Sequence, residues 1–139
     1  MKRKKKSPRA SAKELLDSVF SKWIRLKNAD ENGYCKCITC SVVLHWKEIT
    51  NGHYVKRNVM GTRYVEENCG PQCWGCNAKH LGDGRKDEHA LHIMRKYGPE
   101  QLEKLNQAKH RTTKFHTYDL TAMIAVYKRE LEKLGGING

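Results

Sequence analysis

The sequence predicts an α+β fold in which a small zinc-held core is flanked by α-helices on its N-terminal and C-terminal sides. Three observations lead to this prediction. Two Cys-x-x-Cys pairs, Cys37/Cys40 and Cys73/Cys76, enclose a segment with strand-like composition. Four thiolates at this spacing are typical of one tetrahedral Zn²⁺ site. Amphipathic helical patterns precede the first pair and follow the second.

The composition favours a single domain with a modest core. The chain has 139 residues and a hydrophobic content of 38%, below the usual 45–50% or so, so a metal staple would help it to fold. No apolar segment follows the basic start, and no apolar run reaches the ~18 residues of a membrane span. We therefore expect no signal peptide and no membrane partner. Of the possible uses of the six cysteines, we expect metal binding in a reducing compartment rather than disulfides.

The net charge of +12 indicates a polyanionic partner, most simply nucleic acid. A basic surface of the ribosomal type is the alternative, because charge provides affinity and not chemistry.

The N-terminal part divides into an arm and a helix. Residues 1–10 are predicted to be a disordered basic arm, and residues 11–134 one domain with its zinc core at 34–86, followed by a tail at 135–139. A helix is expected over 11–28, opened by a capping box of Ser11 and Glu14. Its apolar face consists of Leu15, Leu16, Val19, Phe20, Trp23 and Leu26.

The core should combine short strands with a short helix. Residues 34–48 are predicted to hold the first zinc knuckle and a strand. Asn51-Gly52 has the composition of a hairpin turn that leads into a second strand. A short helix should begin near Asn77. Cys35 and Cys69 have no assigned role.

Two helices and a final helix follow the core. Residues 87–108 are predicted to form two helices broken at Gly98-Pro99, with Leu91 and Met94 on the apolar side and His89 on an exposed face. Residues 109–116 form a basic loop, and a last helix runs over 117–134.

His53 is the strongest candidate for chemistry, because a histidine titrates near neutral pH and suits general-base work. Lys56, Arg57 and Arg63 follow it and are expected to hold phosphates, although an ordinary solvated basic face is the alternative. Asn77 and His80 share a helix face where a divalent metal could bind, unless Asn77 is a helix N-cap.

The chain resembles the HNH (ββα-metal) nucleases and, more closely, the NinG/Rap family of lambdoid phage recombination endonucleases. The motifs that carry this resemblance are Cys37-Ile38-Thr39-Cys40, Gly52-His53-Tyr54, Arg63-Tyr64, Glu67-Asn68, Gln72-Cys73 and Cys76-Asn77. The resemblance covers residues 11–134 and implies an HNH core, a phage origin, and a location in the cytoplasm of the bacterial host.

The resemblance also implies roles. His53 would be the general base, Asn68 would order the loop that carries it, and Asn77, with His80, would bind a catalytic Mg²⁺ or Mn²⁺. The four cysteines would hold a structural Zn²⁺. Many HNH enzymes have a metal-binding Asp before the first His, and here that residue is Gly52, so His80, Asp83 or Glu67 would have to complete the site.

The function implied is cleavage of phosphodiester bonds in branched DNA, such as Holliday junctions, D-loops and forks, by a homodimer. Arg57 or Arg63 would also stabilise charge in the transition state. The residues expected to contact DNA are Lys56, Arg57, Arg63, Lys79, Arg85, Arg111 and Lys114. Two alternatives remain open: a zinc-finger DNA-binding module without catalysis, and a sequence-specific HNH nicking or restriction endonuclease.

Overall fold

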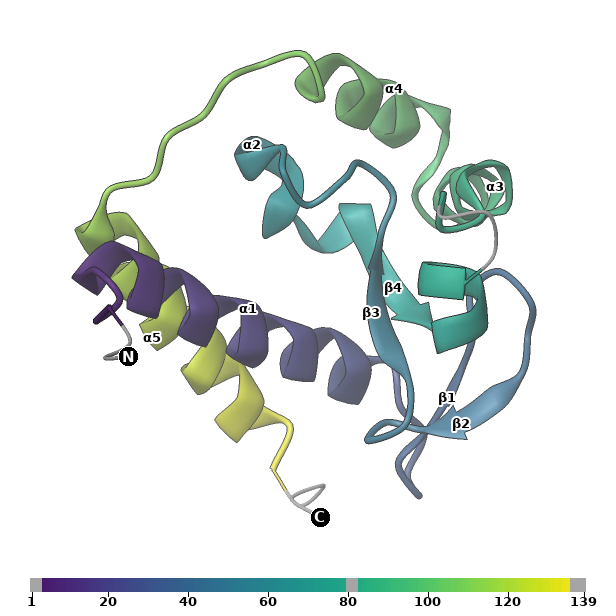
Figure 1. Cartoon of the computed structure of the whole chain (residues 1–139). Helices are drawn as coiled ribbons and strands as arrows, with labels where there is room; N and C mark the ends of the chain where they lie inside the picture. Colours follow the sequence, from purple (N-terminus) through teal and green to yellow (C-terminus); the bar gives the residue numbers. More distant parts are fainter. Residues whose placement is uncertain (1–3, 80–82, 136–139) are drawn as a thin grey trace.

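Five α-helices and two small antiparallel sheets make up the mixed α/β fold within the part of the chain that the structure, a computed structural model, describes (Figure 1). That part comprises residues 4–79 and 83–135, with the backbone alone for Lys79. The elements in chain order are α1 (Pro8–Lys27), β1 (Tyr34–Lys36), β2 (Val43–His45), β3 (Thr50–His53), α2 (Met60–Arg63), η1 (Glu66–Asn68), β4 (Cys69–Gln72), η2 (Gly75–Lys79), α3 (Lys86–Tyr97), α4 (Pro99–Ala108) and α5 (Thr117–Lys133).

The first helix begins at Pro8 and not at Ser11, so the predicted capping box is wrong and the end of the predicted arm is helical. Ser7 caps the helix by accepting a hydrogen bond from the backbone N–H of Ala10 at 3.1 Å. Proline at the first helical position has the required φ already. Glu14 forms an ion pair with Lys6 instead of closing a box.

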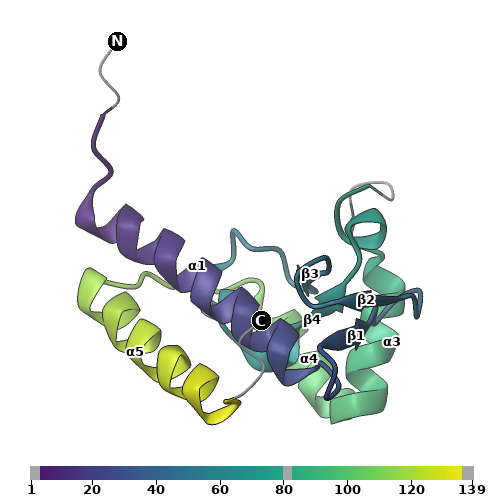
Figure 2. The same cartoon turned by 90° about the horizontal axis from the view of Figure 1, so that it is seen from below.

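The main apolar core lies between α1 and α5, which run side by side (Figure 2). The buried face of α1 includes Leu16, Phe20 and Trp23, as the helical pattern predicted, whereas Leu15, predicted on the same face, is exposed. Leu120 and Ile124 of α5 pack against it. The final helix ends at Lys133, one residue before the predicted end at 134. Among the described residues, no helix has both the length and the apolar character needed to cross a membrane.

The two small sheets are both antiparallel, and the strands of the second sheet, β3 and β4, contact α1. β1 pairs with β2, and β3 pairs with β4 in the register Thr50↔Gln72, Gly52↔Gly70 and His53↔Cys69. The prediction of a turn at Asn51-Gly52 is therefore wrong, because both residues lie inside strand β3.

Helices α3 and α4 meet at Gly98, whose φ of 96° suits glycine and ends α3 where predicted. The buried side of α3 is different from the predicted one. Ile93 is fully buried, His89 is 1% exposed, and Leu91 and Met94 are exposed. The expected exposed position of His89 is therefore wrong; its ring packs against Tyr54 with centroids 5.8 Å apart.

His89 should make folding sensitive to acid. Burial lowers its pKa to about 3, with contributions from His92 and His53, and neither ring nitrogen has a hydrogen-bond partner among the described residues. Because the pKa of His89 is lower in the folded state than in the unfolded state, the unfolded state takes up a proton first as the pH falls. The free energy of unfolding is therefore not reduced by His89 above pH ~6.5 and decreases as the pH falls toward 3. His89→Leu should therefore gain about 3 kcal/mol relative to wild type between pH 7 and 4.

The measurement is urea unfolding at both pH values with saturating zinc. His116→Leu, at an exposed position on the N-terminal side of α5, is the control and should follow wild type. If the free energy of unfolding changes equally between pH 7 and 4 for His89→Leu and for wild type, the prediction is wrong.

Candidate functional site

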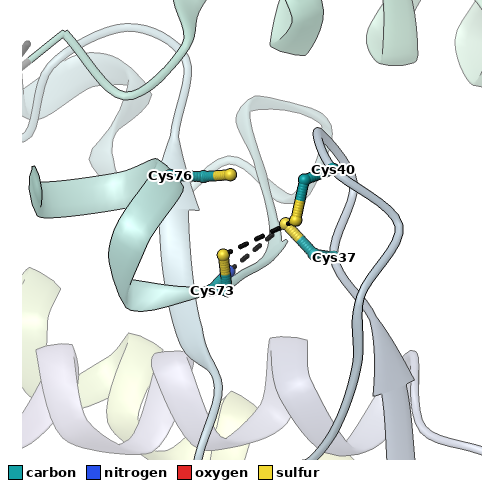
Figure 3. Close-up of side chains that lie close together, drawn as sticks. All are labelled: Cys37, Cys40, Cys73 and Cys76. Atoms are coloured by element: carbon teal, nitrogen blue, oxygen red, sulfur yellow. Dashed lines mark hydrogen bonds between the residues drawn. The ribbon is translucent and has the colours of Figure 1, made fainter. Parts of the chain in front are cut away.

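The four predicted cysteines converge on one point (Figure 3). Cys37 follows β1, Cys40 lies in the turn before β2, Cys73 follows β4, and Cys76 lies in η2. Their sulfur atoms all lie within 4.8 Å of one another. The Cys40 and Cys73 sulfurs are 3.7 Å apart, close to the ~3.8 Å edge of a tetrahedron with Zn–S bonds of about 2.3 Å. The donor set and its size therefore fit a structural zinc ion.

The electrostatics of the cluster also favour a cation. Burial on its own would raise the pKa of Cys37, but hydrogen bonds from Thr39 and from the backbone N–H of Cys73 lower it to about 6. A backbone hydrogen bond from Val42 opposes a rise in the pKa of Cys40, but burial and the neighbouring thiols raise it to about 12. The Cys37 thiolate thus forms readily, and its negative charge disfavours ionisation of the neighbouring Cys40. A bound divalent cation removes this repulsion between thiolates.

The other two cysteines lie outside this cluster. Cys35 is fully buried, and its thiol donates to the carbonyl oxygen of Arg25 at 3.1 Å. Burial raises its pKa to about 11 and also raises that of Cys69. Both are protonated structural thiols, and within residues 4–79 and 83–135 the four-cysteine group is the single metal-binding cluster of His, Cys, Asp and Glu side chains.

His53 stands at the end of β3 on the wall of a cleft of about 1220 Å³. Its Nε2 lies 2.9 Å from the carbonyl oxygen of Arg63. A carbonyl can only accept, so Nε2 carries the hydrogen, and the neutral ring keeps its lone pair on Nδ1. Burial lowers the pKa of His53 to about 4, and the charges of Arg57 and Arg63 act in the same direction. At neutral pH, His53 is therefore an unprotonated base of fixed tautomer.

Asn68 fixes the segment that follows His53. It is fully buried, and its Oδ1 accepts from the backbone N–H of Val55 at 2.8 Å. Its Nδ2 donates to the carbonyl oxygens of Val55 and Thr62, each at 3.1 Å. One amide side chain thus joins the two ends of the loop between β3 and α2.

Arg63 has a different position from the one expected of a phosphate-binding or transition-state residue. It is 8% exposed, and it donates to Asp17 from Nε at 2.8 Å and from Nη2 at 2.6 Å. Its remaining terminal nitrogen, Nη1, donates to the carbonyl oxygen of Arg57 at 2.8 Å. The guanidinium of Arg63 therefore forms its hydrogen bonds within the protein. These bonds anchor the residue whose own carbonyl oxygen accepts from His53.

Asp17 is the residue that sequence reasoning missed. Besides Arg63, it accepts from the hydroxyl of Tyr64 at 2.7 Å and lies 3.3 Å from Nη2 of Arg57. Burial on its own would raise the pKa of Asp17, but the hydrogen bonds from Arg63 and Tyr64 lower it below the ordinary value. The helical pattern of α1 could not reveal this role, because the partners lie far along the chain.

Replacing Asp17 should destabilise the fold. Asp17→Asn removes the charge that neutralises the buried Arg63 guanidinium, and we expect a loss of about 3 kcal/mol in the free energy of unfolding. Urea unfolding measures it. Glu14→Gln, which breaks the exposed pair with Lys6, is the matched control and should cost under about 1 kcal/mol. Equal losses in the two variants would show that the buried pair has no special weight.

Lysine and arginine side chains line the cleft beside amide, hydroxyl and apolar ones. Lys56 and Arg57, which were expected to hold phosphates, are among them. Other basic side chains on its wall are Arg25, Lys86, Lys109 and His110, and the acidic ones are Asp17 and Asp83. The excess of positive charge suits a phosphate backbone.

Three other predicted DNA contacts, Arg85, Arg111 and Lys114, are not among the residues that line the cleft. Arg85 pairs with Glu88 at 3.5 Å. Arg111 and Lys114 are exposed but lie outside the cleft lining. The side chain of Lys79 and the whole of His80 are outside the described residues.

Asn77 also lines the cleft, from η2. It lies inside the helical turn, so the alternative of an N-cap is wrong. Its Nδ2 donates to the hydroxyl of Thr50 at 2.9 Å, which fixes the amide and turns Oδ1 away from that bond. Asp83 lines the same cleft and accepts from the backbone N–H of Arg85 at 2.9 Å.

The glycine before His53 has a steric reason. A Cβ at Gly52 would lie 2.1 Å from Oε1 and 2.9 Å from Cβ of Gln72. Gln72 is fully buried, and its Nε2 donates to Thr39 and to the carbonyl oxygen of Gly84. The space that an aspartate would need is therefore occupied, and position 52 cannot supply a metal-binding carboxylate.

The fold and the cysteine cluster define a small mixed α/β protein with a four-thiolate site that fits zinc. The family described as Bacteriophage Lambda NinG protein matches residues 1–136. The chain belongs to this phage family. No curated protein and no solved structure matches it.

Proposed function

We propose that this protein is a metal-dependent endonuclease of the HNH type that cleaves phosphodiester bonds in branched DNA. The observation that carries the proposal is His53, an unprotonated histidine of fixed tautomer on the wall of a cation-rich cleft. The element order supports an HNH core, because two paired strands, β3 and β4, are followed by the helical turn η2 with Asn77. Family membership suggests a role in phage recombination.

The residues of the cleft divide the chemistry among them. Nδ1 of His53 takes a proton from the attacking water, while the carbonyl of Arg63 holds the ring. Arg57 and Lys56 line the cleft and hold the phosphate on either side of the scissile bond. Of the two arginines expected to stabilise charge, Arg57 is the one that lines the cleft, so the proposal gives this role to Arg57.

A catalytic Mg²⁺ or Mn²⁺ fits the oxygen donors of the cleft. Asn77 and Asp83 lie on its wall, and amide and carboxylate oxygens are the ligands that such cations prefer. Asp17 is excluded as a ligand, because its carboxylate is bound to Arg63 and Tyr64. When bound, the ion would supply Lewis acidity at the phosphate and at the leaving oxygen. The cysteine site would contribute no chemistry, because four thiolates leave no open position on zinc.

A homodimer is part of the proposal, because a four-way junction has two-fold symmetry and needs two symmetric cuts. The inward faces of α1 and α5 are used in the core of one chain. The dimer contact therefore has to use other surfaces than these faces.

The test is cleavage of a labelled four-way junction, a fork and a linear duplex by zinc-loaded protein, with Mg²⁺, with Mn²⁺, or with neither ion added. We expect metal-dependent cuts in the branched substrates. The competing proposal is a zinc-stapled DNA-binding module without catalysis, which the glycine at position 52 favours. Salt-dependent binding of all three substrates without a cut under either metal would establish that alternative. Equal cleavage of the linear duplex, at a defined sequence, would indicate a nicking or restriction enzyme instead.

A further inference from the structure

Three cations gather around one tryptophan near the C-terminal end of α1. The Nζ atoms of Lys22 and Lys47 lie 5.6 and 5.7 Å from the centre of the Trp46 ring. The guanidinium carbon of Arg25 lies 5.4 Å from the same centre. Lys22 and Arg25 come from α1, and Lys47 follows β2. We call Lys22, Arg25 and Lys47 the Trp46 basic cluster.

The cluster is rigidly built around its tryptophan. Trp46 is 7% exposed and packs with the cysteines of the knuckle. Arg25 donates from Nη1 to the carbonyl oxygen of Trp46 at 2.8 Å and from Nε to that of Ser21 at 3.1 Å. The end of α1 is in turn joined to β1 through the thiol of Cys35, which donates to Arg25.

No carboxylate within residues 4–79 and 83–135 forms an ion pair with a member of the cluster. Cation–ring contacts of this kind are individually weak, while three like charges held close together repel one another. An arrangement of this kind is favourable when a polyanion supplies the missing negative charge.

The cluster adjoins the cleft that contains His53. Arg25, Ser21 and Thr50 lie on the cleft wall, so the cluster starts where that wall ends. Lys56, on the other hand, belongs to the lining without approaching Trp46. The basic surface therefore has two parts, the cleft and the Trp46 basic cluster, which meet at Arg25.

We propose that the Trp46 basic cluster binds the phosphates of a second duplex arm of DNA while a first arm lies in the cleft. This inference rests on the proposed function, since it takes the first arm to be at His53. A lysine is a flexible point charge that can follow a backbone of either strand polarity, and Arg25 adds a fixed donor at the border. A branched substrate offers two arms at once, so the second contact gives preference for branches without any reading of bases.

The test removes the two lysines together and keeps Arg25, whose hydrogen bonds hold Trp46. Affinities of Lys22→Ala/Lys47→Ala and wild type are measured with zinc-loaded protein and without added Mg²⁺ or Mn²⁺ over a range of salt concentrations, for a four-way junction and for a linear duplex with the same number of base pairs. We expect the junction to bind about tenfold more weakly at roughly 0.1 M salt, with a salt slope shallower by about two. The linear duplex should change little.

The matched control is Lys128→Ala/Arg129→Ala, which removes the same charge from exposed positions on α5 and should bind both substrates like wild type. Zinc content and circular dichroism check the folding of each variant. Equal losses on junction and linear duplex, or an equal loss in the control, would overturn the proposal.

Because this assay contains no Mg²⁺ or Mn²⁺ to support cleavage, the two proposals can fail separately. If wild type never cuts but the double variant loses affinity for the junction alone, the second-arm contact stands and the nuclease assignment fails. If wild type cuts junctions but the double variant binds them like wild type, the nuclease assignment stands and the second-arm contact fails.

Discussion

Replacing Cys37 by serine should unfold the centre of the protein. Its sulfur lies among the other three cysteine sulfurs, all within 4.8 Å of one another, so the variant loses a zinc ligand. Zinc binding at structural sites contributes roughly 10–16 kcal/mol that appears as folding free energy, more than the usual stability of a small domain. The same core cluster contains Trp46, Ile49 and Leu26, and it should come apart with the cysteines.

The measurements are zinc content by mass spectrometry, tryptophan fluorescence and thermal unfolding, with and without a strong chelator. Cys35→Ser is the matched control, because Cys35 is also buried but lies outside the four-sulfur group. It should keep one zinc per chain and lose only modest stability. A Cys37→Ser protein that holds zinc and melts like wild type would show that the cluster is not a structural metal site.

Replacing His53 by alanine should abolish cleavage while leaving DNA binding intact. A general base contributes about 10²–10⁴-fold, so the single-turnover rate on the junction should fall by that factor. The affinity should stay the same, because the cations that line the cleft remain. His116→Ala makes the same change at an exposed position outside the cleft and should cleave at the wild-type rate.

The pH profile provides a second check on His53. Its pKa is lowered to about 4, and the base is needed in its unprotonated form. The rate should therefore be maintained as the pH falls to about 5.5 and decline only on approach to 4, whereas an ordinary histidine would already be largely protonated near 5.5. A His53→Ala protein with the wild-type rate and profile would falsify the role of His53 as the base.

Short-range signals in the sequence predicted much of the structure. The spacing of Cys37 and Cys40 fixes a tight turn by itself, and Gly98-Pro99 ends one helix and starts the next within two residues. Such features depend on backbone geometry and on neighbours along the chain. The apolar face of α1 was equally readable, because its period of 3.6 is local.

Contacts between distant residues were not predictable in this way. The bonds from Arg63 to Asp17 span 46 positions, and nothing local distinguishes Arg63 from the exposed Arg57. Gly52 looked like a turn residue because glycine serves both in turns and at close approaches. Only the position of Gln72 across the sheet decides between the two uses. The sequence likewise predicted an exposed His89, and only its packing against the distant Tyr54 accounts for its burial.

The pairing of α1 with α5 has a consequence for biosynthesis. The two helices come from opposite ends of the described chain, and they share the largest apolar core. During translation, α1 leaves the ribosome before α5, so Leu16, Phe20 and Ile24 of α1 remain uncovered until α5 has been made. The cysteine knuckle, whose ligands all precede α3, can close earlier. The nascent chain therefore has a metal-held centre before it has a complete core. The uncovered apolar face of α1 is the part most in need of a chaperone.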